Sequence, residues 1–353
     1  MQNISSLTLV LTERCNFSCP YCQQLKGKNT LKIDAIKVFL NFLQPQLEKE
    51  VWLGFYGGEP LLAWPLIEKT VAYLRKNRKS KFHFSLTTNG SLLKEGHILF
   101  LKENSFKLLM SYDGLAQFRR DKNSVSAVEK ALKSLQKLYP QGYAINSVFT
   151  PATVSLLADS MTALMKQGHQ RLQYTLDLSV PWLANDLLTL ANELDRLAEF
   201  GSDHFQKNGR RPLLNFNSDA EADSKGVFAC FAGRDRLALL PDNTVWGCYL
   251  FYDLLGHAAE NPDYEKYCFG KLPGFIGAGK KNRTVAANYH DLRQDYFFTA
   301  KKNLCSLCPE LEYCSICPVV AALATSCLGI IPDWVCRIRQ VNDKIHALIA
   351  RSN

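Results

Sequence analysis

Alternating strand and helix patterns run through the first two thirds of this chain, and they constrain its fold more than any other feature. Six β-rich runs are each followed by an amphipathic helix pattern. Six such units predict an α/β fold whose parallel sheet is either doubly wound or curved into a partial barrel. The expected strands span 5–12, 51–56, 81–87, 106–112, 142–149 and 171–178. The expected helices span 30–47, 62–76, 92–104, 124–138, 151–167 and 183–207.

Polar and glycine-rich sequences follow the first four predicted strands, at the edge of the sheet where barrel enzymes keep their chemistry. Three cysteines follow the first strand, and Gly57-Gly58-Glu59-Pro60 follows the second. Thr87-Thr88-Asn89-Gly90 and Ser111-Tyr112-Asp113-Gly114 follow the third and the fourth. Each sequence alone is compatible with ordinary turn chemistry. Four of them on one edge predict a binding site.

The cysteines after the first strand are Cys15, Cys19 and Cys22, which place three thiols within eight residues. Three thiolates from one tight loop can hold a cubane iron–sulfur cluster by three of its four irons. The fourth iron is then open to another ligand. The alternative is three buried or zinc-bound cysteines, but zinc sites want four ligands, usually in separated pairs.

The Cys-x3-Cys-x2-Cys spacing, with Tyr21 before the last cysteine, resembles the signature of the radical S-adenosylmethionine (radical SAM) family. The resemblance implies that SAM chelates the open iron of a [4Fe-4S] cluster, and that one-electron reduction splits it to a 5′-deoxyadenosyl radical. It also implies a partial TIM-like (β/α)6 barrel over residues 1–210, with Tyr21 beside the adenine of SAM. The residues that resemble the family motif for the SAM amino group are Gly57, Gly58, Glu59 and Pro60.

Other polar residues near the strand ends extend this predicted SAM pocket. Arg119 or Arg120 would fork onto a carboxylate of SAM or of the substrate; the alternative is a capping or surface cation. Asn146 and Ser147 either face the same cavity or are solvated strand-end residues. Short side chains suited to the ribose hydroxyls or the SAM carboxylate are those of Thr87, Asn89 and Ser111.

After residue 207 the β/α rhythm stops, and residues 213–353 contain nine cysteines. Two short β runs around Pro241-Asp242-Asn243 predict a hairpin that ends near Cys248. The dense cysteine spacing over 305–317 does not fit a zinc ribbon, whose pairs are farther apart. It resembles the SPASM extension of radical SAM peptide and protein maturases, which implies a small α+β domain over 211–353. Two departures are Asn243 in place of the usual turn glycine and a last cysteine spacing of two instead of three.

The SPASM resemblance implies two auxiliary [4Fe-4S] clusters in this second domain. The fourth ligand of one cluster stays open, since it is Cys268, Cys327 or a substrate thiolate. The alternative for Cys268 and Cys327 is two ordinary buried thiols. By position, one cluster would be held by Cys305, Cys308, Cys314 and Cys336. The other would be held by Cys230, Cys248 and Cys317.

Composition and charge restrict the cellular setting and the partners. The chain has 353 residues, a formal net charge of +9 and twelve cysteines, without a secretion signal or an apolar run long enough to cross a bilayer. We therefore expect a cytoplasmic protein whose cysteines are metal ligands instead of disulfides. The basic run over 75–81 is a solvated turn. No nucleic-acid motif is present, so neither nucleic acid nor a membrane is an expected partner.

These resemblances predict a maturase that abstracts hydrogen from a peptide or protein and forms a thioether, C–C or related cross-link. The alternative is an anaerobic sulfatase maturase that makes formylglycine; such sequences have an aspartate directly after the second hairpin cysteine, where Tyr249 stands here. Asp253 is the nearest acid, so Tyr249 and Asp253 are the catalytic candidates. A non-catalytic iron–sulfur electron carrier is a third reading. The expected electron donor is a flavodoxin- or ferredoxin-type protein. Recognition of a leader peptide, where there is one, would use either a separate leader-binding protein or the core's own edge.

Overall fold

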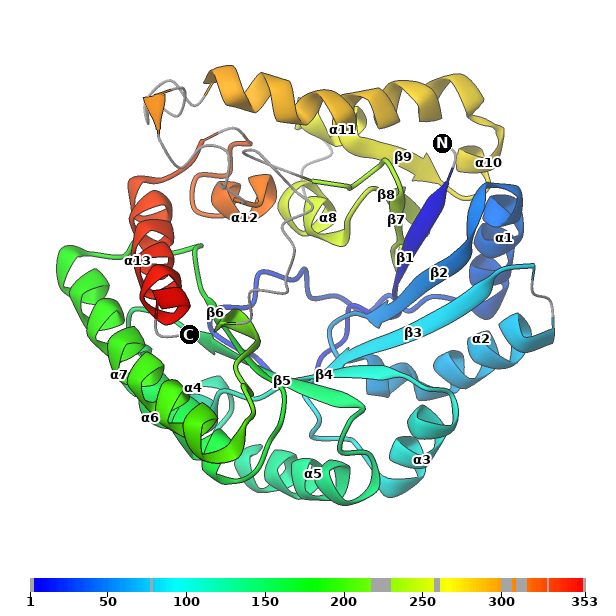
Figure 1. Cartoon of the computed structure of the whole chain (residues 1–353). Helices are drawn as coiled ribbons and strands as arrows, with labels where there is room; N and C mark the ends of the chain where they lie inside the picture. Colours follow the sequence, from blue (N-terminus) through cyan, green and yellow to red (C-terminus); the bar gives the residue numbers. More distant parts are fainter. Residues whose placement is uncertain are drawn as a thin grey trace.

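A single sheet organises the computed structural model (Figure 1). The structure describes residues 3–76, 79–216, 230–256, 261–299, 307–308, 316–328 and 330–351, without the side chains of 262, 293–299 and 343–351. Nine strands among these residues lie in the order β6-β5-β4-β3-β2-β1-β7-β8-β9. The first six strands in the chain form two thirds of the sheet, and three strands from the C-terminal segment extend it past β1.

The six N-terminal strands are parallel, and all six lie where the sequence predicts strands. Each of these strands pairs with the strand that comes before or after it in the chain, which is the arrangement that right-handed crossovers produce. The α/β class and the partial barrel are therefore confirmed. The strands are β1 (Ile4–Val10), β2 (Leu47–Tyr56), β3 (Lys81–Thr88), β4 (Lys107–Ser111), β5 (Tyr143–Phe149) and β6 (Leu172–Leu176).

Helices cover the outer side of these strands, while the inner side faces the centre of the molecule (Figure 1). On β2 the outward residues Val51, Leu53 and Phe55 are at most 1% exposed, and burying one such side chain contributes about 1.5–3 kcal/mol. The short helix α4 (Gln117–Arg120) was not predicted from the sequence. The larger helices are α1 (Ile33–Leu43), α2 (Trp64–Lys76), α3 (Glu95–Glu103), α5 (Val125–Leu138), α6 (Leu157–Lys166) and α7 (Ala184–Asn208).

The predicted hairpin is present and continues the main sheet. Strand β7 (Arg236–Leu239) pairs parallel with β1, and β8 (Thr244–Trp246) pairs antiparallel with β7. Asn243 in the turn has φ +66°, the left-handed conformation that asparagine tolerates. Strand β9 (Cys268–Lys271) adds an antiparallel edge. One sheet thus spans both parts of the chain, with antiparallel pairs only among β7, β8 and β9 of the described strands, and a domain boundary at residue 210 stays a prediction.

The remaining C-terminal helices are α8 (Tyr249–Leu255), α9 (Pro262–Tyr267), α10 (Gly274–Gly277), α11 (Gly279–Thr299), α12 (Pro318–Ala322) and α13 (Asp333–Arg351). They continue around the molecule from α10, beside α1, to α13, beside α7, and α8 and α12 lie nearer its centre (Figure 1). The hydroxyl of Tyr174 on β6 donates to Oδ1 of Asn342, and Nε1 of Trp334 donates to the Leu178 carbonyl, so the last helix is joined to the sixth strand. No helix in the described ranges is long and apolar enough to cross a membrane.

Candidate functional site

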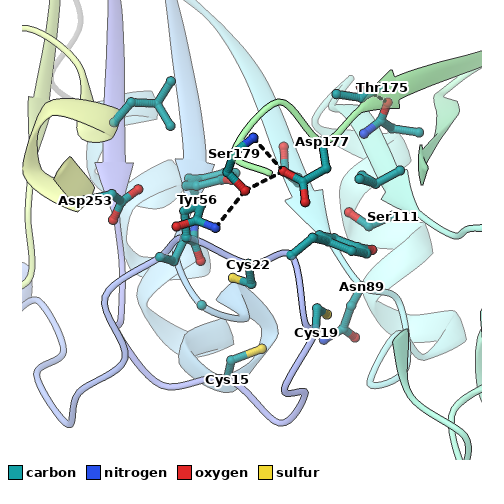
Figure 2. A pocket seen from close by; sticks show the side chains of 18 of the residues that line it. Cys15, Cys19, Cys22, Tyr56, Asn89, Ser111, Thr175, Asp177, Ser179 and Asp253 are labelled. Atoms are coloured by element: carbon teal, nitrogen blue, oxygen red, sulfur yellow. Dashed lines mark hydrogen bonds between the residues drawn. The ribbon is translucent and has the colours of Figure 1, made fainter. Parts of the chain in front are cut away.

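A cavity of about 480 Å³ lies at the carboxyl ends of the parallel strands (Figure 2). Both halves of the sequence line it. The N-terminal part contributes strand ends and the loop that carries Cys15, Cys19 and Cys22, which we call the cysteine loop, and the C-terminal part contributes α8 and α12. The predicted residues that line it are Cys15, Cys19, Tyr21, Cys22, Gly57, Gly58, Thr87, Asn89, Ser111, Asn146, Tyr249 and Asp253. The structure thus brings most of the candidate residues together.

The glycine pair after β2 clamps the start of the cysteine loop. The backbone N–H of Gly58 donates to the Thr12 carbonyl at 2.8 Å, and that of Glu59 donates to the Arg14 carbonyl at 2.9 Å. A Cβ at Gly58 would collide with the Arg14 carbonyl oxygen, and Gly57 has φ +144°, which side chains rarely adopt. Only glycine therefore allows the two backbones to approach this closely, directly before Cys15.

Glu59 lies beneath the cavity and is engaged by the protein itself. It is 1% exposed and accepts hydrogen bonds from the backbone N–H groups of Leu61 and Asn89 and from the Thr88 hydroxyl, at 2.7 to 2.9 Å. These bonds hold Asn89, whose side-chain amide donates to Oδ1 of Asn16 in the cysteine loop. The Glu59 side chain therefore supports the cysteine loop and does not line the cavity, and Pro60, which begins a short 3-10 turn, does not line it either. Their part in SAM binding stays a prediction.

The three thiols of the cysteine loop face the cavity from one side (Figure 2). Burial raises the pKa of Cys15 and of Cys19, and the Arg120 guanidinium near Cys19 opposes the rise. Among the described residues, no three His, Cys, Asp or Glu side chains lie close enough to hold one metal ion. Three soft sulfur donors around one cavity fit an iron–sulfur cluster, which binds each thiolate on a separate iron.

Arg120, and not its neighbour, reaches the cavity. Its side chain is 9% exposed, Nη1 lies 3.6 Å from Oδ1 of Asp113, and Nε and Nη1 are buried without a hydrogen-bond partner among the described residues. The Tyr21 hydroxyl donates to Asp113 at 2.5 Å, which completes this network. Arg119 is exposed, stacks on Phe118 and lines an adjoining hollow of about 530 Å³. Beside its ion pair with Asp113 and its contact with Cys19, Arg120 therefore keeps N–H groups that can donate hydrogen bonds to a ligand carboxylate.

Helix α8 brings the two catalytic candidates to the cavity. Asp253 accepts a hydrogen bond from the Leu25 N–H at 3.4 Å, and burial raises its pKa to about 7. A carboxyl group with such a pKa can take up or release a proton near neutral pH. Tyr249 packs against Tyr56 with ring centroids 4.3 Å apart, and the two hydroxyl groups interact. The helix begins directly after Cys248, which is its N-cap residue.

The loop after β6 also lines the cavity, and the sequence interpretation missed it. Oδ1 of Asp177 accepts from the Ser179 hydroxyl at 2.6 Å, and that hydroxyl accepts from Gln23 of the cysteine loop at 3.1 Å (Figure 2). The signal was available, because an acid and a serine follow an apolar strand here as they do elsewhere on this edge. Because the predicted strand extended to residue 178, Asp177 was assigned to the strand and not to the loop after it. Asn146 lines the cavity, whereas Ser147 is buried and donates to the Tyr112 carbonyl.

Three of the predicted auxiliary ligands gather beside α8. Burial raises the pKa of Cys248 to about 12, and the nearby thiols of Cys230 and Cys317 add to the rise. Cys268 is buried on β9, and Cys327 is exposed. Cys308 and Cys336 are described and partly buried, while Cys305 and Cys314 lie outside the described residues. The ligand sets of the auxiliary clusters stay a prediction.

Sequence comparisons place this chain among known enzymes. The model of the radical SAM superfamily matches residues 9–153. A GTP 3′,8-cyclase of Corynebacterium glutamicum is 30% identical over 69% of this chain and 71% of its own length. The radical SAM cyclopropyl synthase TigE of Paramaledivibacter caminithermalis is 24% identical over 70% of this chain and 58% of its own length. A cysteine-type anaerobic sulfatase-maturating enzyme of Clostridium novyi is 24% identical over 49% of this chain and 51% of its own length. The match therefore spans little more than half of these last two relatives.

Solved structures share the fold over nearly the whole chain. Native anSMEcpe with bound AdoMet has a TM-score of 0.72 at 18% identity and covers 99% of this chain and 100% of its own. Streptococcus suis SuiB bound to S-adenosylmethionine has a TM-score of 0.59 at 15% identity, covering 95% of this chain and 77% of its own. Further structures contain anSMEcpe with a Cp18Cys peptide and SuiB with its precursor peptide SuiA. At these identities the likeness establishes the fold alone.

Proposed function

Because this chain belongs to the radical SAM superfamily, we propose that it is a maturase that joins atoms within a peptide or protein by a thioether, C–C or related cross-link. One observation carries this proposal. The three thiols of the cysteine loop share a single cavity with Tyr249, Asp253 and Leu323 from the C-terminal segment. Both parts of the molecule therefore face the same reacting groups. Relatives solved with peptides support a peptide as the substrate.

Cys15, Cys19 and Cys22 would hold a [4Fe-4S] cluster, and the neighbouring strand ends would hold SAM. When bound, SAM and the cluster supply a 5′-deoxyadenosyl radical that removes a hydrogen atom from the substrate. The unsatisfied nitrogens of Arg120 would bind the SAM carboxylate, because a guanidinium forks onto two oxygens. The short polar side chains for the ribose and the remaining carboxylate contacts are Thr87, Asn89, Ser111 and Asn146. Arg119, outside the cavity, is left as a candidate for the substrate.

The cavity walls protect the reacting groups from water. Leu109, Val148 and Leu250 line the cavity from the sheet and from α8, and Val320 and Leu323 line it from α12. A carbon radical survives only where solvent groups are excluded and the target hydrogen is held close. The C-terminal segment thus closes the side of the barrel that six strands leave open. We further propose that its cysteines bind auxiliary clusters, and that a flavodoxin- or ferredoxin-type protein donates electrons.

When the new bond forms, the substrate would lose one hydrogen atom to the deoxyadenosyl radical, one proton to Asp253 and one electron, for which an auxiliary cluster in the C-terminal segment would be the acceptor. The Asp253 carboxyl lies in the cavity with a pKa raised to about 7 by burial, so both protonation states are accessible at neutral pH. This position also supports the second candidate function, formylglycine formation. A sulfatase maturase would need a base at the same place, and anSMEcpe shares the fold. Tyr249, directly after Cys248, favours the cross-linking reaction over this alternative.

Anaerobic reconstitution tests both functions. Reduced protein with SAM should release deoxyadenosine, and Mössbauer spectra with iron counting should find about twelve irons for three clusters, against four for one. Mass spectrometry of peptide products then separates the reactions. A cross-link removes two hydrogens and leaves no aldehyde, whereas formylglycine reacts with an aldehyde reagent. Failure to form deoxyadenosine from SAM would refute the proposed enzymatic function. That result would favour a non-catalytic electron carrier instead.

A further inference from the structure

The inner face of β2 and β3 carries an exposed aromatic and charged cluster that the proposed chemistry does not use. We call Glu50, Trp52, Lys81 and His83 the inner platform. Trp52 is 46% exposed, and its ring stacks on His83 with centroids 5.0 Å apart and planes inclined by 28°. Nε2 of His83 lies 2.9 Å from one oxygen of Glu50, and Nζ of Lys81 lies 3.0 Å from the other. These contacts orient the indole ring while nearly half of the residue stays open to solvent.

The inner platform and the cavity lie on the same face of the sheet. Side chains alternate along a strand, so Trp52 shares a face with Gly54 and Tyr56, and Tyr56 lines the cavity. The register pairs Trp52 with His83 and Gly54 with Ser85, which continues the face onto β3. The helices pack on the opposite face (Figure 1). Gly54 places no side chain between the platform and the cavity, and its neighbours at that point are the hydroxyl groups of Ser85 and Thr8.

The spacing along the strand matches a short stretch of peptide. Trp52 precedes Tyr56 by four residues on β2, and a strand rises about 3.3 Å per residue, so about 13 Å separate them. An extended peptide covers the same distance in about four residues. A bound peptide can therefore place one residue in the cavity and another on the inner platform.

Exposed cations lie on the inner face to both sides of the inner platform. Glu50 is bonded by both Lys81 and His83, so its charge is already compensated. Lys107 on β4 is exposed and in register with Ser85. Arg236 on β7 is in register with Ser6, which pairs with Trp52; its side chain is 56% exposed, stacks on Phe231 and lies 3.9 Å from Asp235. An acidic partner complements these cations.

We propose that the inner platform anchors the substrate peptide: an aromatic side chain of the peptide stacks on Trp52, and flanking Asp or Glu residues pair with Lys107 and Arg236. The anchored residue lies about four positions from the residue that reacts. This inference rests on the proposed peptide-modifying function and names the class of peptide, an acidic segment with one aromatic residue.

A display library of random twelve-residue peptides, selected on the reconstituted holoenzyme, tests the proposal. Wild-type protein should enrich sequences in which one aromatic residue is flanked by acids. Trp52→Ala should lose the aromatic preference, whereas Trp52→Phe should keep it. Lys107→Glu should lose the acidic preference at least tenfold. Lys133→Glu, an exposed lysine on the outer helix α5, should change neither preference.

Enrichment of basic or non-aromatic sequences, or an acidic–aromatic motif that survives Trp52→Ala and Lys107→Glu, would overturn the proposal. Deoxyadenosine formation by the same wild-type preparation without peptide separates the two levels of inference. If deoxyadenosine forms and no peptide motif is enriched, the platform proposal fails while SAM cleavage stands. If deoxyadenosine does not form, the proposed function fails, and the platform proposal that rests on it fails with it. Circular dichroism of each variant shows whether a lost preference reflects loss of the fold.

Discussion

Two groups of cysteines in this protein are supported in different ways. The loop with Cys15 is held by polar contacts: the backbone of Gly58 and Glu59 clamps its start, and Asn89 bonds its Asn16. Cys248 is set among buried aromatic rings, where the Tyr289 hydroxyl accepts from the Gly247 N–H and donates to the Tyr267 carbonyl. The loop thiols are thus held by polar contacts to the strand ends at the cavity, whereas the surroundings of Cys248 combine the hydrogen bonds of Tyr289 with the packing of its ring against Phe251.

The largest expected effect is the loss of one loop thiol. Cys15→Ala should abolish deoxyadenosine formation, with a decrease of at least about a thousandfold, because the cluster would lose one of its three protein ligands. Liquid chromatography of the reduced reaction measures it. Ser134→Ala is the control, since this side chain lies on the outer helix α5, away from the cavity. Equal losses in both variants would mean that deoxyadenosine formation does not depend specifically on the thiols of the cysteine loop.

Replacing the backbone clamp should come next. In Gly58→Ala the added methyl group meets the Arg14 carbonyl, so the loop must move away from β2. We expect a loss of about 3 kcal/mol in the free energy of unfolding and a lower iron content. Gly96→Ala in α3 is the control, because nothing lies within 4 Å of its Cβ and alanine favours helices by about 1 kcal/mol. A well-tolerated Gly58→Ala would show that shape, not backbone approach, positions the loop.

Acid should destabilise the protein through a residue outside both cysteine groups. His169 is 3% exposed, bonds the Tyr143 hydroxyl at 2.7 Å, and has a pKa lowered to about 4 by burial. Because the folded state favours neutral histidine, stability should be full above about pH 6.5 and fall as the pH drops toward 4, by at most about 3 kcal/mol. His169→Gln should flatten this slope in urea titrations. An unchanged slope would assign the acid sensitivity to other groups, the cysteine regions included.

The aromatic support of Cys248 should show the smallest effect. Tyr289→Phe leaves the Gly247 N–H and the Tyr267 carbonyl without their partner in a buried site, which should cost about 2 kcal/mol in the free energy of unfolding. Tyr73→Phe, which removes an exposed hydrogen bond to Asn41, should cost at most about 0.5 kcal/mol. A larger loss of iron in Tyr289→Phe than in Gly58→Ala would reverse the comparison between the two groups.

The strand and helix pattern of the first half could be predicted because its apolar periodicity is local. Each predicted strand and the residues that follow it were found from the sequence, including Gly57-Gly58-Glu59-Pro60. The roles within that motif were not, because a sequence does not show that Glu59 turns inward to hold Asn89. The choice between Arg119 and Arg120 likewise depends on which of two adjacent helical positions faces inward. Asp177 was missed because the predicted strand ended two residues beyond the true end of β6.

By itself, the sequence determined the α/β order of the core, the three thiols after β1 and the asparagine turn of the hairpin. Each of these follows from neighbouring residues, through periodicity, spacing or backbone preference. Only the tertiary structure decided that β7 joins β1, that Asp253 enters the cavity of Cys22, and that Trp52 lies open on the inner face. These features depend on contacts between residues far apart in the chain, where packing and register, and not local preference, select one arrangement.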